Sequence, residues 1–199
     1  MNKGTKEQRN KGTIDYKRGY RTKPNLFKKL FWLLPFSLKH FKTINFIKHI
    51  IPKVNSVVDV GSSEGKFLYL LKLRSIKNLK GIEPNIYYSE FCEKYFKIPV
   101  IKKYIEEVPI IKADLVTAIA ILEHLENPEN FIRRIDAKYL FLVFPIENPI
   151  VEGHIQSLTF REVMDMFYKY HWKPIKIELY WKEQIKSLDL FILLEKKNR

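Results

Sequence analysis

The chain has 199 residues, of which 46% are hydrophobic and 14% aromatic, and a formal net charge of +14 at pH 7. So apolar a composition excludes a disordered chain, and the length is that of one globular domain. Cys92 is the sole cysteine, which excludes an intramolecular disulfide. No stretch approaches the roughly 20 apolar residues of a transmembrane segment, and the charged start lacks the apolar core of a signal peptide. We therefore expect one domain in a reducing, cytoplasmic setting.

The positive charge is concentrated at the N-terminus. Residues 1–53 hold 14 Lys and Arg against two acids, whereas the rest of the chain holds 22 against 20. Residues 1–23 show no apolar periodicity, so they are predicted to form a flexible basic tail. Such a tail attracts nucleic acid, phosphate or an anionic membrane surface, or it simply keeps the chain in solution.

Residues 24–54 are predicted to form an N-terminal helical cap. Apolar residues recur at helical spacing on both sides of Pro35, which indicates two short helices broken there. The apolar stripe could close a cofactor pocket and exclude water, and its lysines would also suit peripheral contact with an anionic membrane. The stripe consists of Leu30, Phe31, Leu33, Leu34, Leu38, Phe41 and Ile44.

From residue 55 to 199, short apolar runs alternate with amphipathic segments, which is typical of an α/β domain with a parallel sheet flanked by helices. We predict a seven-stranded, mostly parallel sheet whose last two strands form an antiparallel hairpin, because no helix separates them. The predicted strands are 56–60, 79–83, 100–102, 115–119, 139–144, 175–180 and 190–194, and the predicted helices are 66–73, 86–96, 128–135 and 160–171.

Residues 57–65, VVDVGSSEG, run from an apolar strand through a glycine-bearing turn into a helix. Glycines there let a ligand approach the backbone, where helix N–H groups point at it, although they can also serve only a tight connection. Glu83 ends the next predicted strand, about 20 residues later, where an acid can accept hydrogen bonds from both hydroxyls of a ribose. The two features together predict a cofactor site.

This arrangement resembles class I, Rossmann-like S-adenosylmethionine-dependent methyltransferases, whose first motif is an acid followed by Gly-x-Gly-x-Gly. Asp59, Gly61 and Gly65 match the motif, Glu83 matches the family's ribose-binding acid, and Ser63 replaces the middle glycine. Residues 114–125, DLVTAIAILEHL, are similar to the fourth strand and its continuation, and residues 144–162 resemble the ubiquinone-biosynthesis-like branch. The resemblance implies methyl transfer to an acceptor that, in this branch, is often a small molecule or a lipid-linked metabolite.

The resemblance also implies a cofactor site at one edge of the sheet. Its methionine end would lie by the glycine turn and its ribose on Glu83. Adenine would lie against Ile105 with Tyr104 beside it, although both residues also suit ordinary core packing. The expected cofactor contacts are Asp59, Gly61, Ser62, Ser63, Gly65, Glu83, Pro84, Tyr104, Ile105, Ala118 and Ile119.

The candidate catalytic residues are Glu123, His124 and His154. A histidine titrates near neutral pH and can take a proton from the acceptor as the methyl group arrives, or it can simply pack at a helix start. The three residues resemble part of the metal site of small-RNA 2′-O-methyltransferases, which has a further glutamate where this chain has Ala120. Since losing a carboxylate should greatly weaken a magnesium or manganese site, we expect no metal.

Other functions stay open at this point. The basic N-terminus is compatible with an RNA- or DNA-directed methyltransferase, although the chain lacks the Asn/Asp-Pro-Pro-Tyr/Phe motif of amino-group DNA methyltransferases, and Cys92 lacks the Pro-Cys context of cytosine C5 enzymes. Ser63 and Ala120 are compatible with a non-catalytic, methyltransferase-like binding protein. The C-terminal hairpin and the acid at Asp59 count against a nicotinamide-dependent dehydrogenase. The acceptor and the oligomeric state are not specified by these patterns.

Overall fold

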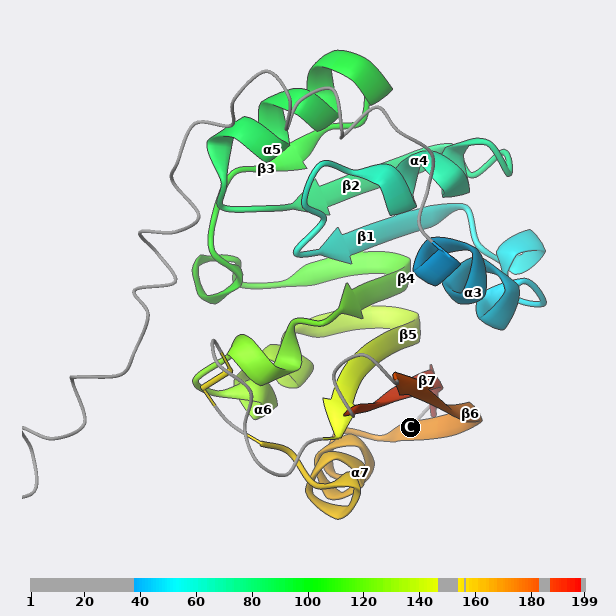
Figure 1. Cartoon of the computed structure of the whole chain (residues 1–199), viewed down its shortest axis with the longest axis vertical. Coiled ribbons are helices and arrows are strands. Elements are labelled where there is room, and N and C mark those ends of the chain that lie inside the picture. Colours follow the sequence, from blue (N-terminus) through cyan, green and yellow to red (C-terminus); the bar gives the residue numbers. More distant parts are fainter. Residues whose placement is uncertain (1–37, 147–153, 156, 183–186, 198–199) are drawn as a thin grey trace, which may run out of the picture.

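The computed structural model describes residues 38–146, 154–155, 157–182 and 187–197 (Figure 1). Their seven strands form one sheet in the order β3-β2-β1-β4-β5-β7-β6. The first five strands run parallel, and β7 pairs antiparallel with both β5 and β6. This confirms the predicted mostly parallel sheet with a C-terminal hairpin. The strands are β1 Ser56–Val60, β2 Asn78–Ile82, β3 Val100–Ile101, β4 Ile111–Ile119, β5 Ile135–Ile146, β6 Trp172–Lys182 and β7 Ser187–Lys196.

Five described helices flank the sheet, and their starts follow local signals. The Asn85 side chain accepts from the backbone at the start of α5, and Thr159 and Glu162 form a capping box at the start of α7. No helix among the described residues is long and apolar enough to cross a membrane. The helices are α3 Leu38–Ile47, α4 Lys66–Lys72, α5 Ile86–Phe91, α6 Pro128–Arg133 and α7 Phe160–Lys169; short helical turns lie at Ile51–Lys53, Cys92–Phe96, Ile105–Glu107 and Leu122–His124.

The core lies on both faces of the sheet, because successive side chains of a strand point to opposite sides. Val58 and Val116 contribute to one apolar cluster, which includes residues of α6 and α7. Their neighbours Val57 and Leu115 contribute to a second cluster, which includes residues of α3 and α4. Because helices cover both faces of the sheet, the ends of the strands and the turns that follow them are the part of the sheet open to a ligand.

The described part of the predicted cap is α3, which is a core helix. Phe46 is 1% exposed, and its ring lies 5.7 Å from that of Phe191 in β7. Lys176 of β6 donates from Nζ to the Phe46 carbonyl at 3.2 Å, across 130 positions of sequence. Figure 1 shows α3 beside the start of β1, away from the turn that follows this strand, so α3 does not close a pocket over that turn. Residues 24–37 of the predicted cap and the predicted tail, 1–23, lie outside the described residues.

Candidate functional site

The turn after β1 is attached to the end of β2 through backbone hydrogen bonds and one carboxylate. The amides of Gly61 and Ser62 donate to the Ile82 carbonyl at 2.8 and 3.2 Å. Glu83 Oε2 accepts from the Ser63 amide and Oε1 from the Asn85 amide, each at 2.9 Å. The side chain of Glu83 thus joins the glycine turn to the start of α5. Burial raises the pKa of Glu83, and the two backbone hydrogen bonds oppose that rise.

Ser63 occupies a backbone conformation that favours glycine. Its φ is 49°, in the left-handed region, which costs a residue with a Cβ on the order of 1–2 kcal/mol. The Ser63 hydroxyl donates to Glu64 Oε2 at 2.6 Å, which holds the side chain in place. The turn therefore keeps the shape that a glycine would adopt, at a cost in stability.

Asp59 lies beneath the turn and connects β1 to β4. It is 4% exposed, and its Oδ1 accepts a hydrogen bond from Thr117 Oγ1 at 2.6 Å. Burial raises its pKa to about 7, although the Thr117 hydroxyl lowers it, and the nearby Glu83 charge raises it further. Thr117 was not among the site residues predicted from the sequence. The available signal was its hydroxyl within the apolar run of β4, opposite Asp59 in register.

The end of β4 comes close to the turn. Ala118 is fully buried and Ile119 partly buried. Beyond them, Ile121 covers Gly61: a Cβ added to Gly61 would lie 2.0 Å from Ile121 Cδ1. Ile121 was also missed, because its contact depends on how the loop returns over β1. Any ligand above Gly61 shares this space with the Ile121 side chain.

The other expected cofactor residues are spread around the same end of the strands. Ile105 is buried and lines a pocket of about 180 Å³ together with Phe131, whereas Tyr104 is not among its lining residues. Ser62 is buried beside Gly81, and Pro84 is partly exposed after Glu83. Gly65 begins α4 with a φ of 81°, and a Cβ there would lie 2.2 Å from the Cys92 sulfur, so its absence lets α4 pack closely against the chain after α5.

A wider hollow of about 670 Å³ lies elsewhere. Pro109, Ile110, Ile135 and Asp136 are among its lining residues, so it lies where β4 and β5 begin. The glycine turn follows the end of β1, and β1 runs parallel to β4 and β5. This hollow therefore lies at the opposite end of the strands from the glycine turn.

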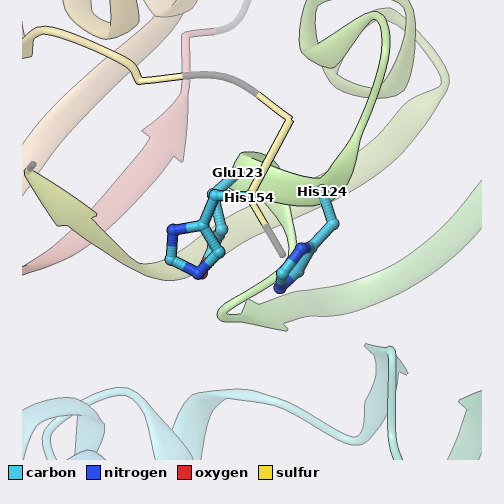
Figure 2. Close-up of side chains that lie close together, drawn as sticks. All are labelled: Glu123, His124 and His154. Carbon is cyan, nitrogen blue, oxygen red and sulfur yellow. The ribbon is translucent and has the colours of Figure 1, made fainter. Parts of the chain in front are cut away.

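The three candidate catalytic residues are brought together (Figure 2). Glu123 and His124 belong to the helical turn Leu122–His124 directly after β4, and His154 comes from the segment between β5 and α7. The rings of His124 and His154 lie 4.9 Å apart, edge to face at 78°. One ligand atom of each residue lies within 4.8 Å of the other two. Glu123 is buried, and both histidines are partly exposed, so the cluster is reachable from solvent.

A backbone hydrogen bond aligns the two segments that carry this cluster. The amide of Ile155 donates to the Glu123 carbonyl at 3.1 Å, so the residue after His154 is attached directly to the turn after β4. Two nitrogen bases and a carboxylate at one point can move a proton or hold a metal ion.

The sequence and the fold together determine the class. Residues 58–137 match the methyltransferase-domain family. These residues match a methyltransferase domain, and the sheet has the class I methyltransferase fold. The matched residues include the turn after β1, Glu83 and the turn with Glu123 and His124. Enzymes of this class take the methyl group from S-adenosylmethionine, which is therefore the methyl donor of this methyltransferase.

Solved methyltransferases share the fold at low identity. A methyltransferase of Thermotoga maritima is 18% identical, with a TM-score of 0.61, over 80% of this chain and 89% of that one. Magnesium protoporphyrin IX methyltransferase of Synechocystis, with bound S-adenosylhomocysteine, is 8% identical, with a TM-score of 0.67, over 86% and 94%. The 1,6-didemethyltoxoflavin N1-methyltransferase of Burkholderia thailandensis is 10% identical, with a TM-score of 0.64, over 78% and 76%. No curated protein matches the sequence.

Proposed function

We propose that this methyltransferase acts on a small-molecule or lipid-linked acceptor, as in the ubiquinone-biosynthesis-like branch, and that S-adenosylmethionine lies across the ends of β1, β2 and β4. The observation that carries the donor site is the Glu83 carboxylate, which accepts one backbone N–H on each oxygen at the end of β2. A carboxylate oxygen can accept a second hydrogen bond, so both oxygens retain capacity for a ribose hydroxyl.

The other contacts of the donor follow from the position of its ribose on Glu83. The methionine end would lie over the turn by Asp59 and Gly61, where Ile121 would turn aside, and adenine would lie toward Ile105 and its pocket. Backbone at the end of β4 would complete the site. The proposed set is Asp59, Gly61, Ser62, Ser63, Gly65, Glu83, Pro84, Tyr104, Ile105, Ala118 and Ile119.

The acceptor would lie by Glu123, His124 and His154, at the partly exposed cluster after β4. The His124 imidazole would take the proton that the acceptor releases as it attacks the methyl group, and Glu123 and His154 would orient it. A small acceptor is supported by the tight grouping of the three side chains, since one functional group can contact them all. The Burkholderia thailandensis neighbour was solved with such a compound, 1,6-didemethyltoxoflavin.

Calorimetry tests the donor site without knowledge of the acceptor. The full-length protein should bind S-adenosylmethionine and S-adenosylhomocysteine and should not bind NAD. Binding of NAD in preference to both would overturn the proposal. A screen of small hydroxyl, amine and carbon acids with radiolabelled S-adenosylmethionine then identifies the acceptor class.

A second candidate is an RNA- or DNA-directed methyltransferase, favoured by the charge of residues 1–53, which hold 14 Lys and Arg against two acids. Contacts to phosphates release counterions, so binding through these residues would weaken steeply with salt. Salt-dependent binding of a mixed RNA or DNA pool that disappears on deletion of residues 1–23 would support this candidate. Equal binding by the deleted and full-length chains would exclude the tail as the contact.

A further inference from the structure

We propose that β6 is the contact surface for a second copy of this chain, whose own β6 pairs with it antiparallel about a two-fold axis at Ile177. β6 is the last strand of the sheet, and among the described strands only β7 pairs with it (Figure 1). An edge strand presents N–H and C=O groups to which another strand can bind. β6 runs over eleven residues, Trp172–Lys182, so this edge is about 36 Å long.

β6 also carries apolar side chains that the domain leaves exposed. Ile177 lies opposite Ile192 of β7, and Leu179 opposite Leu190, so both lie on the face of the sheet that α7 covers. The two residues of β7 are fully buried, whereas Ile177 is 40% exposed and Leu179 is 55% exposed. Ile175, at the bulge of β6, is also exposed. A long apolar edge of this kind favours pairing with another strand.

Symmetry and charge together select one register for this pairing. In an antiparallel pair, opposite residues point to the same face, so the two-fold axis must lie at a residue that pairs with its own copy. An axis at Lys176 or at Glu178 would place two like charges opposite each other, which is destabilising. An axis at Ile177 instead places Lys176 opposite the partner's Glu178, and Ile175 opposite the partner's Leu179. Ile177 is the middle residue of β6, so this register also matches the two strands along their full length.

The charged face of β6 supports the same register. Lys176 Nζ lies 3.0 Å from Glu178 Oε1 within one chain, on the face of the sheet where Lys176 also contacts Phe46 of α3. In the dimer, two such ion pairs would lie side by side with opposite charges facing each other across the axis. Complementary charges of this kind determine the register of an interface more than its affinity.

The bulge in β6 limits the strength of the contact. It lies between Pro174 and Lys176, and Pro174 has no N–H to donate, so regular pairing is centred on residues 176–178. Such a contact is smaller than the roughly 1,200–2,000 Å² of most stable interfaces, and we expect a reversible dimer at micromolar concentrations. Three strands, β4, β5 and β7, separate β6 from β1 and its glycine turn. The dimer therefore leaves the donor site open and does not depend on the proposed function.

Sedimentation equilibrium of the full-length protein tests the contact. The average mass should rise from that of one chain toward that of two as the concentration increases through the micromolar range. Ile177→Lys places two positive charges at the axis and should raise the dissociation constant at least about tenfold. The matched control is Ile110→Lys, which changes an isoleucine that is 65% exposed just before β4 and should dimerise like the original chain.

A charge exchange tests the register itself. Lys176→Glu alone and Glu178→Lys alone each place like charges opposite each other and should weaken the dimer, whereas the double variant restores opposite charges and should recover it. Melting temperatures show whether each variant is folded. A dimer that Ile177→Lys leaves unchanged, or one that the double variant does not recover, would overturn the proposal. A full-length chain that stays monomeric at every concentration would also overturn it and would leave the apolar row to residues 1–37 or to a different protein.

Discussion

The Glu83 carboxylate shows how one residue serves both the fold and the proposed donor site. Its two oxygens join the turn after β1 to the start of α5 through the amides of Ser63 and Asn85. Its position at the end of the second strand was evident from the sequence, because an acid directly after an apolar run is a local pattern. Its hydrogen bonds were not, because they depend on how β1 and β2 pair.

Substitution of Glu83 should weaken the donor more than it unfolds the chain. Glu83→Ala removes the carboxylate that would accept hydrogen bonds from the ribose hydroxyls, so S-adenosylmethionine affinity should fall by about 1.5–3 kcal/mol in calorimetry. The control is Glu90→Ala, which changes an exposed acid on the neighbouring helix α5 and should leave affinity unchanged. Normal affinity in a Glu83→Ala protein with native circular dichroism would remove Glu83 from the site.

The buried carboxyl group of Asp59 should make stability depend on pH. Its pKa is raised to about 7 in the folded chain, against about 3.9 in the unfolded chain. Between these values the folded state holds a proton that the unfolded state has released. The free energy of unfolding therefore falls as pH rises through this window, by up to about 1.4 kcal/mol per pH unit, and the effect ends above the folded pKa.

Asp59→Asn abolishes this titration, so the variant should gain stability relative to the original chain as pH rises toward 7. The difference should then stay constant above that pH. Urea unfolding of both cofactor-free proteins at pH 5, 6, 7 and 8 measures it. A difference that stays the same at all four values would show that Asp59 ionises as an ordinary exposed acid.

At the scale of elements, strand pairing explains where sequence prediction succeeded and where it fell short. The range predicted for β1 is the observed one, Ser56–Val60, because an apolar run there ends at a glycine. β5 begins at Ile135, before its predicted start at residue 139, because Ile135 and Ala137 pair with β4. The polar Asp136 and Lys138, which alternate with these two residues, hide that pairing from the sequence. The predicted helix 86–96 is α5 followed by a π-helical turn.

The candidate site divides in the same way. Local motifs predicted Asp59, Glu83 and the cluster of Glu123, His124 and His154 from the sequence, and the structure brings the three residues of this cluster together. The sequence could not identify Thr117 or Ile121 as parts of the site, because their roles arise from contacts with β1 about 60 positions away in the chain. Local chemistry is readable from sequence, whereas packing partners require the fold.

Two substitutions in the turn after β1 should affect donor binding differently. Gly61→Val should abolish S-adenosylmethionine binding, since φ is 70° there and a Cβ would overlap Ile121. Ser63→Gly should leave binding nearly unchanged and raise stability by about 1 kcal/mol, because glycine relieves the left-handed strain. Calorimetry and urea unfolding of each variant provide the measurements. A Gly61→Val protein that bound the donor normally would show that the turn lies away from the cofactor.

At the scale of the whole molecule, α3 belongs to the fold and not to a detachable N-terminal segment. Deletion of residues 1–51 removes a helix whose Ile44, Phe46 and Ile47 are buried, so it should expose core, lower solubility and weaken donor binding. Deletion of residues 1–37 is the matched comparison, because it keeps α3, and its melting temperature should stay clearly above that of the 1–51 deletion. Equal melting temperatures for both deletions would contradict this account of α3.

The contact between α3 and the C-terminal hairpin also imposes an order on biosynthesis. Lys176 and Phe46 are separated by 130 positions, and Phe46 packs against Phe191, a residue close to the C-terminus. On the ribosome, α3 is therefore synthesised well before its partners in β6 and β7. Until these strands are made, the nascent chain carries an apolar helix that is not fully buried, which makes it a client for chaperones that bind exposed hydrophobic segments during synthesis.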